Sequence, residues 1–492
     1  MKVIFVASEG VPFSKTGGLA DVVGALPKAL ATLGHRISVF LPRYRSTLPG
    51  QPLPRVGDLT LPFRPNLEFA AVENAGETQG VRTYLLSAPA YFDRDGLYQA
   101  HGQDYPDNAR RFAAFCLAAI EFLKRDPDPP DIIHCHDWQA ALVPIYLRSL
   151  YRDDPYFQKV RVLFTIHNLA YQGLFPPPTL EAMALPSSLF TIEGLEFYGK
   201  VNLLKGGILY SDFVSTVSRK YAEEIQTAEY GCGLDGVLVS RKERLVGILN
   251  GVDYDEWNPA TDKFLPANYT PSDLKGKEVC KAELLRKMGA VTPQMDWPVL
   301  GIVSRFATQK GFDLIGEIAE RLMAKELYIV ALGTGEPQYE ELFREMAAHY
   351  PNKFLAKIAY DNALAHQIEA GADMFLMPSR YEPCGLNQIY SLKYGTPPIV
   401  RATGGLDDTI EDFDGKSGTG FKFHQYSAEA LLEAIERALA AYREPALWRK
   451  IVRNGMKKDF SWTQSARQYV AVYEQLARGS RSAQAVAAEM SS

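Results

Sequence analysis

One loop of the chain combines a carboxylate with a predicted anion-binding turn. The loop 378–388 carries Glu382 and joins an apolar run to a segment of helical periodicity, an order that predicts strand, loop and helix. Cys384, Gly385 and Leu386 would begin the helix, where backbone N–H groups lack intrahelical partners and the dipole favours an anion. A carboxylate that accepts hydrogen bonds from hydroxyls, beside amides that bind phosphate, suits a sugar phosphate.

Two further loops carry candidate phosphate contacts. Lys15, Gly17 and Gly18 lie where the first predicted strand meets the first helix; the glycines allow close backbone approach and positive φ, and the lysine supplies a cation. A plain strand-to-helix turn is the alternative. Arg305 and Lys310 lie five positions apart in the loop that opens the second half, so both can reach one diphosphate, although solvated surface cations have the same pattern.

Two features of the second half could complete a nucleotide site. Thr403 and Gly404 follow a predicted strand in a tight turn that could donate N–H groups to phosphate. Tyr360 ends another predicted strand and could stack on a purine, with simple packing as the alternative. The loop 333–336 lacks the third glycine of a nicotinamide-dinucleotide fingerprint, which disfavours an oxidoreductase.

Polar residues also end two strands of the first half. His134 and His136 would share one face of a strand with Cys135 on the other, an awkward arrangement for three metal ligands, so no metal site is predicted. Asp137 follows directly and is interpreted as an acceptor for a hydroxyl group. His167, at the end of the next strand, is expected to face the same cleft; a structural histidine is the alternative.

Two α/β series must position these residues. The first opens with strand 3–7, helix 19–33 and strand 37–41, as in a doubly wound domain. The polar tract 249–259 is predicted to be the hinge, and the cleft between the two domains is the expected site. The other predicted strands are 132–135, 160–165, 213–217, 245–248, 299–304, 328–332, 354–360, 374–377 and 398–401, and the other predicted helices are 109–124, 428–442 and one that ends near 477.

Composition narrows the class of protein. A chain of 492 residues, 47% apolar and 23% charged, is long enough for two or more globular domains. A net charge of −5 gives no sign of a nucleic-acid partner. Five cysteines without paired spacing predict no disulfide framework. The apolar run before Glu9 is too short for a signal peptide core, and no later run reaches membrane-spanning length. We therefore expect a cytoplasmic protein that contacts neither membrane nor nucleic acid.

Taken together and in order, the motifs resemble those of bacterial glycogen synthases and plant starch synthases over nearly the whole chain. They are Lys15-Thr-Gly-Gly-Leu19, His136-Asp-Trp138, Thr165-Ile-His-Asn168, Asn250-Gly-Val-Asp253, Ser304-Arg305 with Gln309-Lys-Gly311, Glu382-Pro-Cys-Gly-Leu386 and Thr403-Gly-Gly-Leu406. The resemblance implies an α/β protein of GT-B fold, two Rossmann-like doubly wound domains that face an interdomain cleft. It implies an acceptor-side domain 1–250, a nucleotide-sugar-binding domain 251–457, a helix 458–477 that crosses back to the first domain, and a flexible tail 478–492.

The implied activity is that of a retaining hexosyltransferase, ADP-glucose:1,4-α-glucan 4-α-glucosyltransferase. Such an enzyme transfers glucose from ADP-glucose to the non-reducing end of an α-1,4-glucan, glycogen or a maltooligosaccharide, and releases ADP, with neither metal nor pyridoxal phosphate. By position, Arg305 and Lys310 would neutralise the diphosphate, Glu382 would bind the glucose hydroxyls, and His167 and Asp137 would line the reaction centre. The implied donor-binding residues are Lys15, Gly17, Gly18, Asn250, Tyr360, Cys384, Gly385, Leu386, Thr403 and Gly404, with Asn250 on the hinge side and Tyr360 stacked on adenine.

Two positions depart from the family pattern, and several alternatives stay open. Tyr390 stands where many retaining GT-B enzymes have a second glutamate, and Gln139 stands where histidine is common. The nearest alternative function is a UDP-glucose-dependent glucan synthase. A glucan phosphorylase would need pyridoxal phosphate and normally a longer chain, and a non-catalytic glucan-binding protein would represent a different class.

Overall fold

The structure, a computed structural model, describes residues 1–47, 52–63, 68–100 and 102–479. The chain divides into two compact units. Unit 1 comprises Met1–Val217, Ala222–Gly251 and the chain from Trp462 on, and unit 2 comprises Ser218–Tyr221 and Val252–Ser461. The boundary at Gly251 falls inside the tract predicted to be the hinge. Most of the predicted tail, 480–492, lies outside the described residues.

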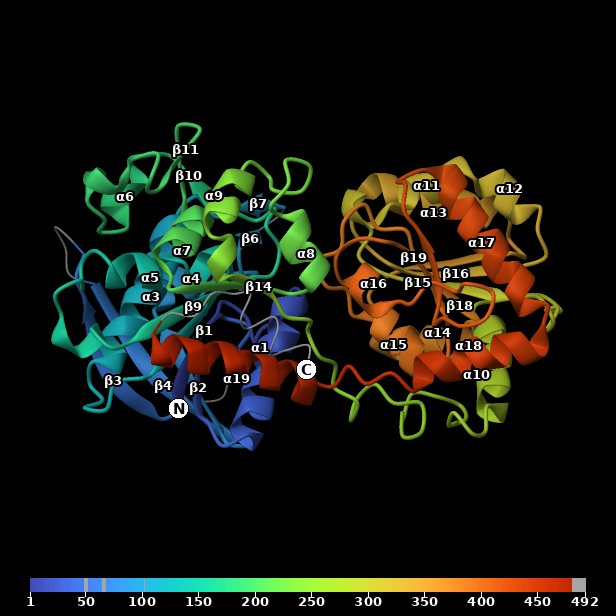
Figure 1. The fold of residues 1–492 in the computed structure, drawn as a ribbon, viewed down its shortest axis with the longest axis horizontal. Helices are drawn as coiled ribbons and strands as arrows, with labels where there is room; N and C mark the ends of the chain where they lie inside the picture. Colours follow the sequence, from blue (N-terminus) through green and yellow to red (C-terminus); the bar gives the residue numbers. More distant parts are fainter. Residues whose placement is uncertain (48–51, 64–67, 101, 480–492) are drawn as a thin grey trace. The chain divides into compact units, whose positions relative to one another are not determined.

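Unit 1 is built on a nine-stranded sheet, counted over the described residues, in the order β14-β13-β9-β8-β1-β2-β5-β4-β3 (Figure 1). Its strands are β1 (Lys2–Val6), β2 (Arg36–Pro42), β3 (Arg55–Leu61), β4 (Glu68–Thr78), β5 (Val81–Ser87), β8 (Ile132–His136), β9 (Arg161–Ile166), β13 (Phe213–Thr216) and β14 (Leu245–Gly247). All pairings are parallel except those of β4 with β3 and β5. Since β1 pairs with β2 on one side and β8 on the other, the strand order reverses there, and ligands bind beyond the carboxyl ends of strands at such a point.

Helices and short strands complete unit 1. The helices are α1 (Gly18–Thr32), α2 (Pro89–Phe92), α3 (Asn108–Leu123), α4 (Asp137–Ala140), α5 (Leu142–Leu147), α6 (Thr179–Ala182), α7 (Leu203–Tyr210), α9 (Asp235–Ser240) and α19 (Trp462–Arg478), and α8 (Arg219–Glu224) is divided between the two units. The short strands are β6 (Gln99–Ala100), β7 (Gln103–Asp104), β10 (Leu174–Phe175), β11 (Glu196–Phe197) and β12 (Lys200–Asn202), and three 3-10 turns lie at Pro155–Phe157, Ser187–Leu189 and Lys242–Arg244. Strand β1 is apolar on consecutive residues because both faces of the sheet are covered.

The last helix of the chain packs against the first. Helices α1 and α19 lie side by side (Figure 1) and cover the sheet face that carries Val3 and Phe5. Tyr473 of α19 is buried, and its hydroxyl lies 2.8 Å from Nδ1 of His134. His134 therefore fixes the terminal helix to the central sheet, which is a structural role.

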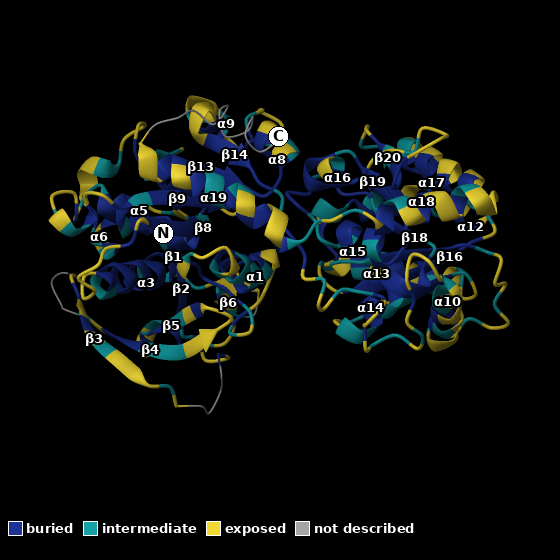
Figure 2. Cartoon of the chain, turned by 60° about the horizontal axis from the view of Figure 1, so that its bottom comes forward, coloured by how far each residue is buried: buried dark blue, intermediate teal, exposed yellow. Residues whose placement is uncertain are grey.

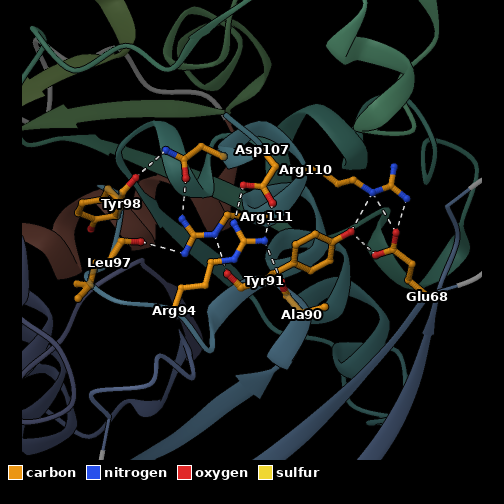
Figure 3. A network of polar contacts seen from close by, with 10 residues as sticks. Glu68, Ala90, Tyr91, Arg94, Leu97, Tyr98, Asp107, Arg110 and Arg111 are labelled. Carbon is orange, nitrogen blue, oxygen red and sulfur yellow. Dashed lines mark hydrogen bonds and ion pairs between the residues drawn. The ribbon is translucent and has the colours of Figure 1, made fainter. Parts of the chain in front are cut away.

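A polar network fastens the segment between α2 and α3 (Figure 3). Arg94 makes two hydrogen bonds of 2.7 Å to the carboxylate of Asp107. The fully buried Arg111 donates to the side chain of Asn108 at 2.6 Å, and also to two backbone carbonyls. Asn108 in turn donates to the carbonyl of Tyr98 at 3.0 Å. These contacts set the position of Tyr98, which reaches the candidate site.

Unit 2 is built on a parallel sheet of six described strands in the order β17-β16-β15-β18-β19-β20. The strands are β15 (Val299–Val303), β16 (Tyr328–Gly333), β17 (Phe354–Ile358), β18 (Met374–Met377), β19 (Pro398–Arg401) and β20 (Phe421–Phe423). The order reverses at β15, between β16 and β18. Figure 2 shows these central strands buried beneath helices with exposed outer faces.

Helices flank the sheet of unit 2. They are α10 (Lys275–Lys287), α11 (Phe312–Glu317), α12 (Ala319–Met323), α13 (Pro337–His349), α14 (Asn362–Gly371), α15 (Asn387–Lys393), α16 (Gly404–Thr409), α17 (Ala428–Tyr442) and α18 (Pro445–Met456), with a 3-10 turn at Thr308–Lys310. Trp257 stacks between His366, at a ring-centroid distance of 3.7 Å, and Tyr390, at 3.9 Å. Tyr390, which stands where many retaining GT-B enzymes have a second glutamate, is therefore part of the aromatic packing of this unit.

The predicted strands and helices are all found. Their ends differ by no more than two residues, except that the helix expected over 458–477 begins at Trp462 and the helix after Glu382 begins at Asn387 instead of Cys384. The five cysteines are free, as predicted. No helix within the described ranges is both long and apolar enough to cross a membrane.

Candidate active site

In unit 2, two predicted site residues form an ion pair. Nζ of Lys310 lies 2.6 Å from Oε2 of Glu382, and both side chains are largely buried. Lys310 follows β15 and Glu382 follows β18, adjacent strands at the point where the strand order reverses. Ser379, which the sequence analysis did not single out, donates to the same carboxylate oxygen at 3.0 Å. The carboxylate is thus held in one orientation.

Close backbone packing explains two glycines near this pair. Gly311 has a φ of 74°, and a Cβ added there would lie 2.0 Å from the carbonyl oxygen of Pro378. Gly404 has a φ of 46°, and a Cβ there would lie 1.9 Å from the carbonyl oxygen of Glu382. The loops after β15, β18 and β19 therefore approach so closely that only glycine fits at these points.

The amides predicted to bind phosphate differ in availability. In the part of the chain that the structure describes, the N–H groups of Gly385 and Leu386 have no hydrogen-bond partner. In contrast, the N–H of Thr403 donates to the carbonyl of Arg401 at 2.9 Å, and that of Gly405 donates to the carbonyl of Glu382 at 3.1 Å. The turn after Thr403 thus fixes the Glu382 loop, and the N–H of Thr403 is already hydrogen-bonded within the chain.

Three predicted residues of unit 2 complete the description. Arg305 is exposed, and no ion pair joins it to a carboxylate among the described residues. Tyr360, two residues beyond β17, is 83% exposed, so its ring is free to stack on a ligand. The side chain of Cys384 is buried.

In unit 1, the glycine-containing loop is held by a carboxylate that the sequence analysis missed. Glu9 is buried and accepts hydrogen bonds from the backbone N–H groups of Thr16 and Gly17, and from the Thr16 hydroxyl at 2.6 Å. The hydroxyl of Tyr98 also donates to Glu9. A single acid in a loop carries no periodic signal, and its position after the first strand was the only clue. Glu9 occupies the position at which the sequence suggested an anion.

The remaining groups of this loop stay accessible. Lys15 forms an ion pair of 2.7 Å with Asp21. The expectation of positive φ is wrong at Gly17, whose φ is −154°, and Gly18 likewise lies outside the left-handed region. A Cβ built at Gly17 or Gly18 would meet nothing within 4 Å. The space beside these glycines is therefore open to a ligand.

Replacing Glu9 with glutamine is expected to loosen this loop. Losing a charged acceptor costs about 1.5–3 kcal/mol per hydrogen bond, so hydrogen exchange at the amides of Thr16 and Gly17 should accelerate about tenfold or more. Tyr98→Phe is the control, because it removes one donor to Glu9 and leaves both amide bonds in place. Unchanged exchange in Glu9→Gln would remove Glu9 as the anchor of the loop.

Asp137 and His167 lie together at the carboxyl ends of β8 and β9. The carboxylate of Asp137 accepts a hydrogen bond of 2.7 Å from the backbone N–H of His167. Burial raises the pKa of Asp137 to about 7, with a further increase from the negative charge of Glu9 and a decrease from the amides of His167 and Asn168. Asp137 has a φ of 55°, a strained value for a residue other than glycine.

A chain of histidines stands behind this pair. Nδ1 of His136 lies 3.0 Å from Nε2 of His167, and Nε2 of His136 is buried without a partner among the described residues. Burial lowers the pKa of His167 to about 3 and holds that of His136 well below its usual range, so both rings are neutral. His134 and His136 share a face, as predicted, with ring centroids 4.1 Å apart.

Two other polar residues of unit 1 are buried with a side-chain oxygen that has no hydrogen-bond partner among the described residues. Asn250 is buried near the end of unit 1, and its Oδ1 has no partner among the described residues. Gln139 is buried as well, and its Oε1 is likewise unpartnered there. No group of three or more His, Cys, Asp or Glu side chains within the described ranges is placed to hold a metal ion.

Comparisons with known proteins show the class to which the chain belongs. The model of the starch synthase catalytic domain matches residues 2–240, and that of glycosyl transferases group 1 matches residues 287–456. The catalytic domain of starch synthase IV from Arabidopsis thaliana, solved with ADP and acarbose bound, superposes with a TM-score of 0.89 at 34% identity and covers 97% of this chain and 99% of that one. Sucrose-phosphate synthase from Thermosynechococcus elongatus, at 18% identity and a TM-score of 0.60, shares the fold. The fold and these matches thus define a glycosyltransferase of GT-B fold.

Whole-chain relatives narrow this class. The glycogen synthase of Koribacter versatilis is 56% identical over 96% of this chain and 98% of its own length. Glycogen synthase 2 of Geobacter sulfurreducens is 47% identical over 97% of this chain and 99% of its own length. The chain belongs to the glycogen synthase family.

Proposed function

We propose that this protein elongates α-1,4-glucans with glucose from ADP-glucose and retains the anomeric configuration. The observation that carries the proposal is the Lys310–Glu382 pair on adjacent loops of unit 2, in a chain that matches glycogen synthases over nearly its whole length. A cation and a carboxylate so placed can serve a sugar diphosphate, the cation at the leaving phosphate and the carboxylate at the sugar hydroxyls. This combination is the one that the reaction needs.

Positive charge acts on the leaving group. As the bond between glucose C1 and the phosphate oxygen breaks, negative charge grows on the departing ADP, and Lys310 with the exposed Arg305 supplies the opposing charge. The amides of Gly385 and Leu386, which have no partner among the described residues, add donors for the diphosphate. In this proposal these groups do the work that a metal ion does elsewhere, and neither a metal nor pyridoxal phosphate takes part.

The proposal gives further contacts to residues of each unit. Tyr360 stacks on adenine, and Lys15 with the open faces of Gly17 and Gly18 contacts the donor. Asp137 accepts a hydrogen bond from a sugar hydroxyl, beside the neutral ring of His167. Asn250 contacts the sugar nucleotide through its Oδ1, which has no partner among the described residues.

Retention follows from transfer on one face of the sugar. The C1–O bond to phosphate breaks, the acceptor O4 bonds to C1 on the same side, and the O4 proton passes to the departing phosphate oxygen. The products are ADP and a glucan longer by one glucose. Trapping of a covalent glucosyl-enzyme on Asp137 or Glu382 would contradict this route.

The raised pKa of Asp137 predicts an acid limb in the pH profile. Lowering the pH through about 7 protonates the carboxyl and weakens it as an acceptor, so kcat/KM should fall below that pH. His167 adds no limb between pH 5 and 9, because it stays neutral above about pH 3. Asp137→Asn should be slow at every pH and lose the limb; an unchanged limb in that variant would assign it to another group.

Isotope-labelled glucose tests the proposal directly. Incorporation into glycogen is measured from ADP-glucose and, in parallel, from UDP-glucose, each with a chelator of divalent metals present. Strong incorporation from ADP-glucose supports the proposal. Incorporation from UDP-glucose alone would overturn the donor assignment, and binding of glycogen without incorporation from either donor would indicate a glucan-binding protein.

A further inference from the structure

The exposed face of α18 and the turn after it gather positive charge in unit 2. A surface depression of about 490 Å³ lies here; its lining residues are Ala446, Arg449, Lys450, Arg453, Asn454 and Lys457. The four cations are all exposed. Within the described ranges, no ion pair joins any of the four to a carboxylate, whereas the neighbouring Lys458 pairs with Glu411.

This arrangement disfavours the isolated helix. Arg449, Arg453 and Lys457 follow one another at intervals of four residues, so that like charges stack along one face, at a cost of about 0.2–0.5 kcal/mol per pair. The helix dipole favours Arg453 and Lys457 near the carboxyl end. The helix dipole does not stabilise the charges of Arg449 and Lys450, which precede the last turn. The opposite face, with Trp448 and other apolar residues, already provides the packing of α18.

Hydrogen bonds to backbone carbonyls hold the walls of the depression. Nζ of Lys450 donates to the carbonyl of Lys416 at 2.8 Å, and Nε of Arg453 donates to that of Pro271 at 3.3 Å. Asn454 donates to the carbonyl of Gly418 at 3.2 Å. Asp414 is not a lining residue, although the charge of Lys450 helps to lower its pKa after the hydrogen bonds from the backbone N–H groups of Ser417 and Lys416. The positive groups are therefore ordered but not neutralised.

We propose that this depression binds a small oligophosphate, a molecule with two or three linked or neighbouring phosphoryl groups. Arginine side chains bind phosphate oxygens in pairs, and lysines add point charges. From Arg449 to Lys457 the helix rises only about 12 Å, which fits a few phosphoryl groups. A nucleic acid would extend beyond this patch over a chain whose net charge is −5. The depression shares no lining residue with the loops of Lys310 and Glu382, so it is a second anion site.

Calorimetric titration with tripolyphosphate at physiological ionic strength tests the site. Four proteins are compared: wild type, Arg449→Gln with Arg453→Gln, Arg286→Gln with Lys287→Gln, and Lys310→Ala. The double variant Arg286→Gln with Lys287→Gln is the matched control, because it removes two exposed cations from α10 in the same unit. Wild type should bind, the α18 variant should bind at least about tenfold more weakly, and both other variants should bind like wild type at this site.

Three results would overturn the proposal. Binding that is lost in Lys310→Ala and intact in the α18 variant would place the oligophosphate at the donor loops. Absence of binding to wild type would show a solvated face. Tighter binding of an oligothymidylate than of tripolyphosphate, with a steep salt dependence, would assign the face to nucleic acid.

Discussion

Lys310→Ala is expected to lower kcat for glucosyl transfer from ADP-glucose by about 10²–10³-fold, the effect of losing one preorganised charge at a developing anion. The lysine lies 2.6 Å from Glu382 and is largely buried, so water replaces its charge poorly. The loss should appear mainly in kcat, since the charge on the diphosphate grows as the bond breaks. Steady-state kinetics with saturating acceptor measures this effect.

A matched lysine separates this effect from general loss of an ion pair. Lys422 also forms a 2.6 Å ion pair, with Asp407, and is buried to a similar degree in the same unit. Lys422→Ala should keep kcat close to wild type, and Lys310→Arg should recover part of the activity. Equal losses in Lys310→Ala and Lys422→Ala would show that Lys310 only stabilises the unit.

The strands and helices could be predicted because their signal is local. Apolar runs such as Val3–Val6 and the helical periodicity of 428–442 are visible in short windows. Contacts between distant segments depend on the order of the strands in the sheet, and a short stretch of sequence carries no information on that order. Lys310 and Glu382 lie 72 positions apart and meet because β15 and β18 are neighbours. The sequence suggested both residues but not their contact.

Several residues make contacts that their local sequence pattern did not indicate. The turn at Thr403 suggested free amides for phosphate, but Gly404 is required where the backbone of Glu382 passes within contact distance. Glu9 was overlooked because one acid among loop residues forms no pattern. His134, half of an apparent metal motif, instead contacts Tyr473, 339 positions later. Each difference arises from tertiary packing, which local patterns do not encode.

Glu382→Gln is expected to lower kcat/KM for ADP-glucose by about 10- to 150-fold, the effect of replacing a charged hydrogen-bond acceptor with a neutral one. Glutamine keeps the shape and can still accept from Ser379. The variant also leaves the largely buried Lys310 without its counter-ion, so the melting temperature should fall. Calorimetry and donor-dependent kinetics measure the two effects separately.

The double variant Lys310→Ala with Glu382→Gln distinguishes pairing from catalysis. In stability the two changes should not add, because removal of both charges leaves neither one unpaired in the interior. In catalysis the losses should multiply, since the lysine acts on the leaving phosphate and the glutamate on the sugar hydroxyls. If the double variant were no slower than Lys310→Ala, Glu382 would act only by positioning Lys310. The carboxylate would then have no contact of its own with the donor.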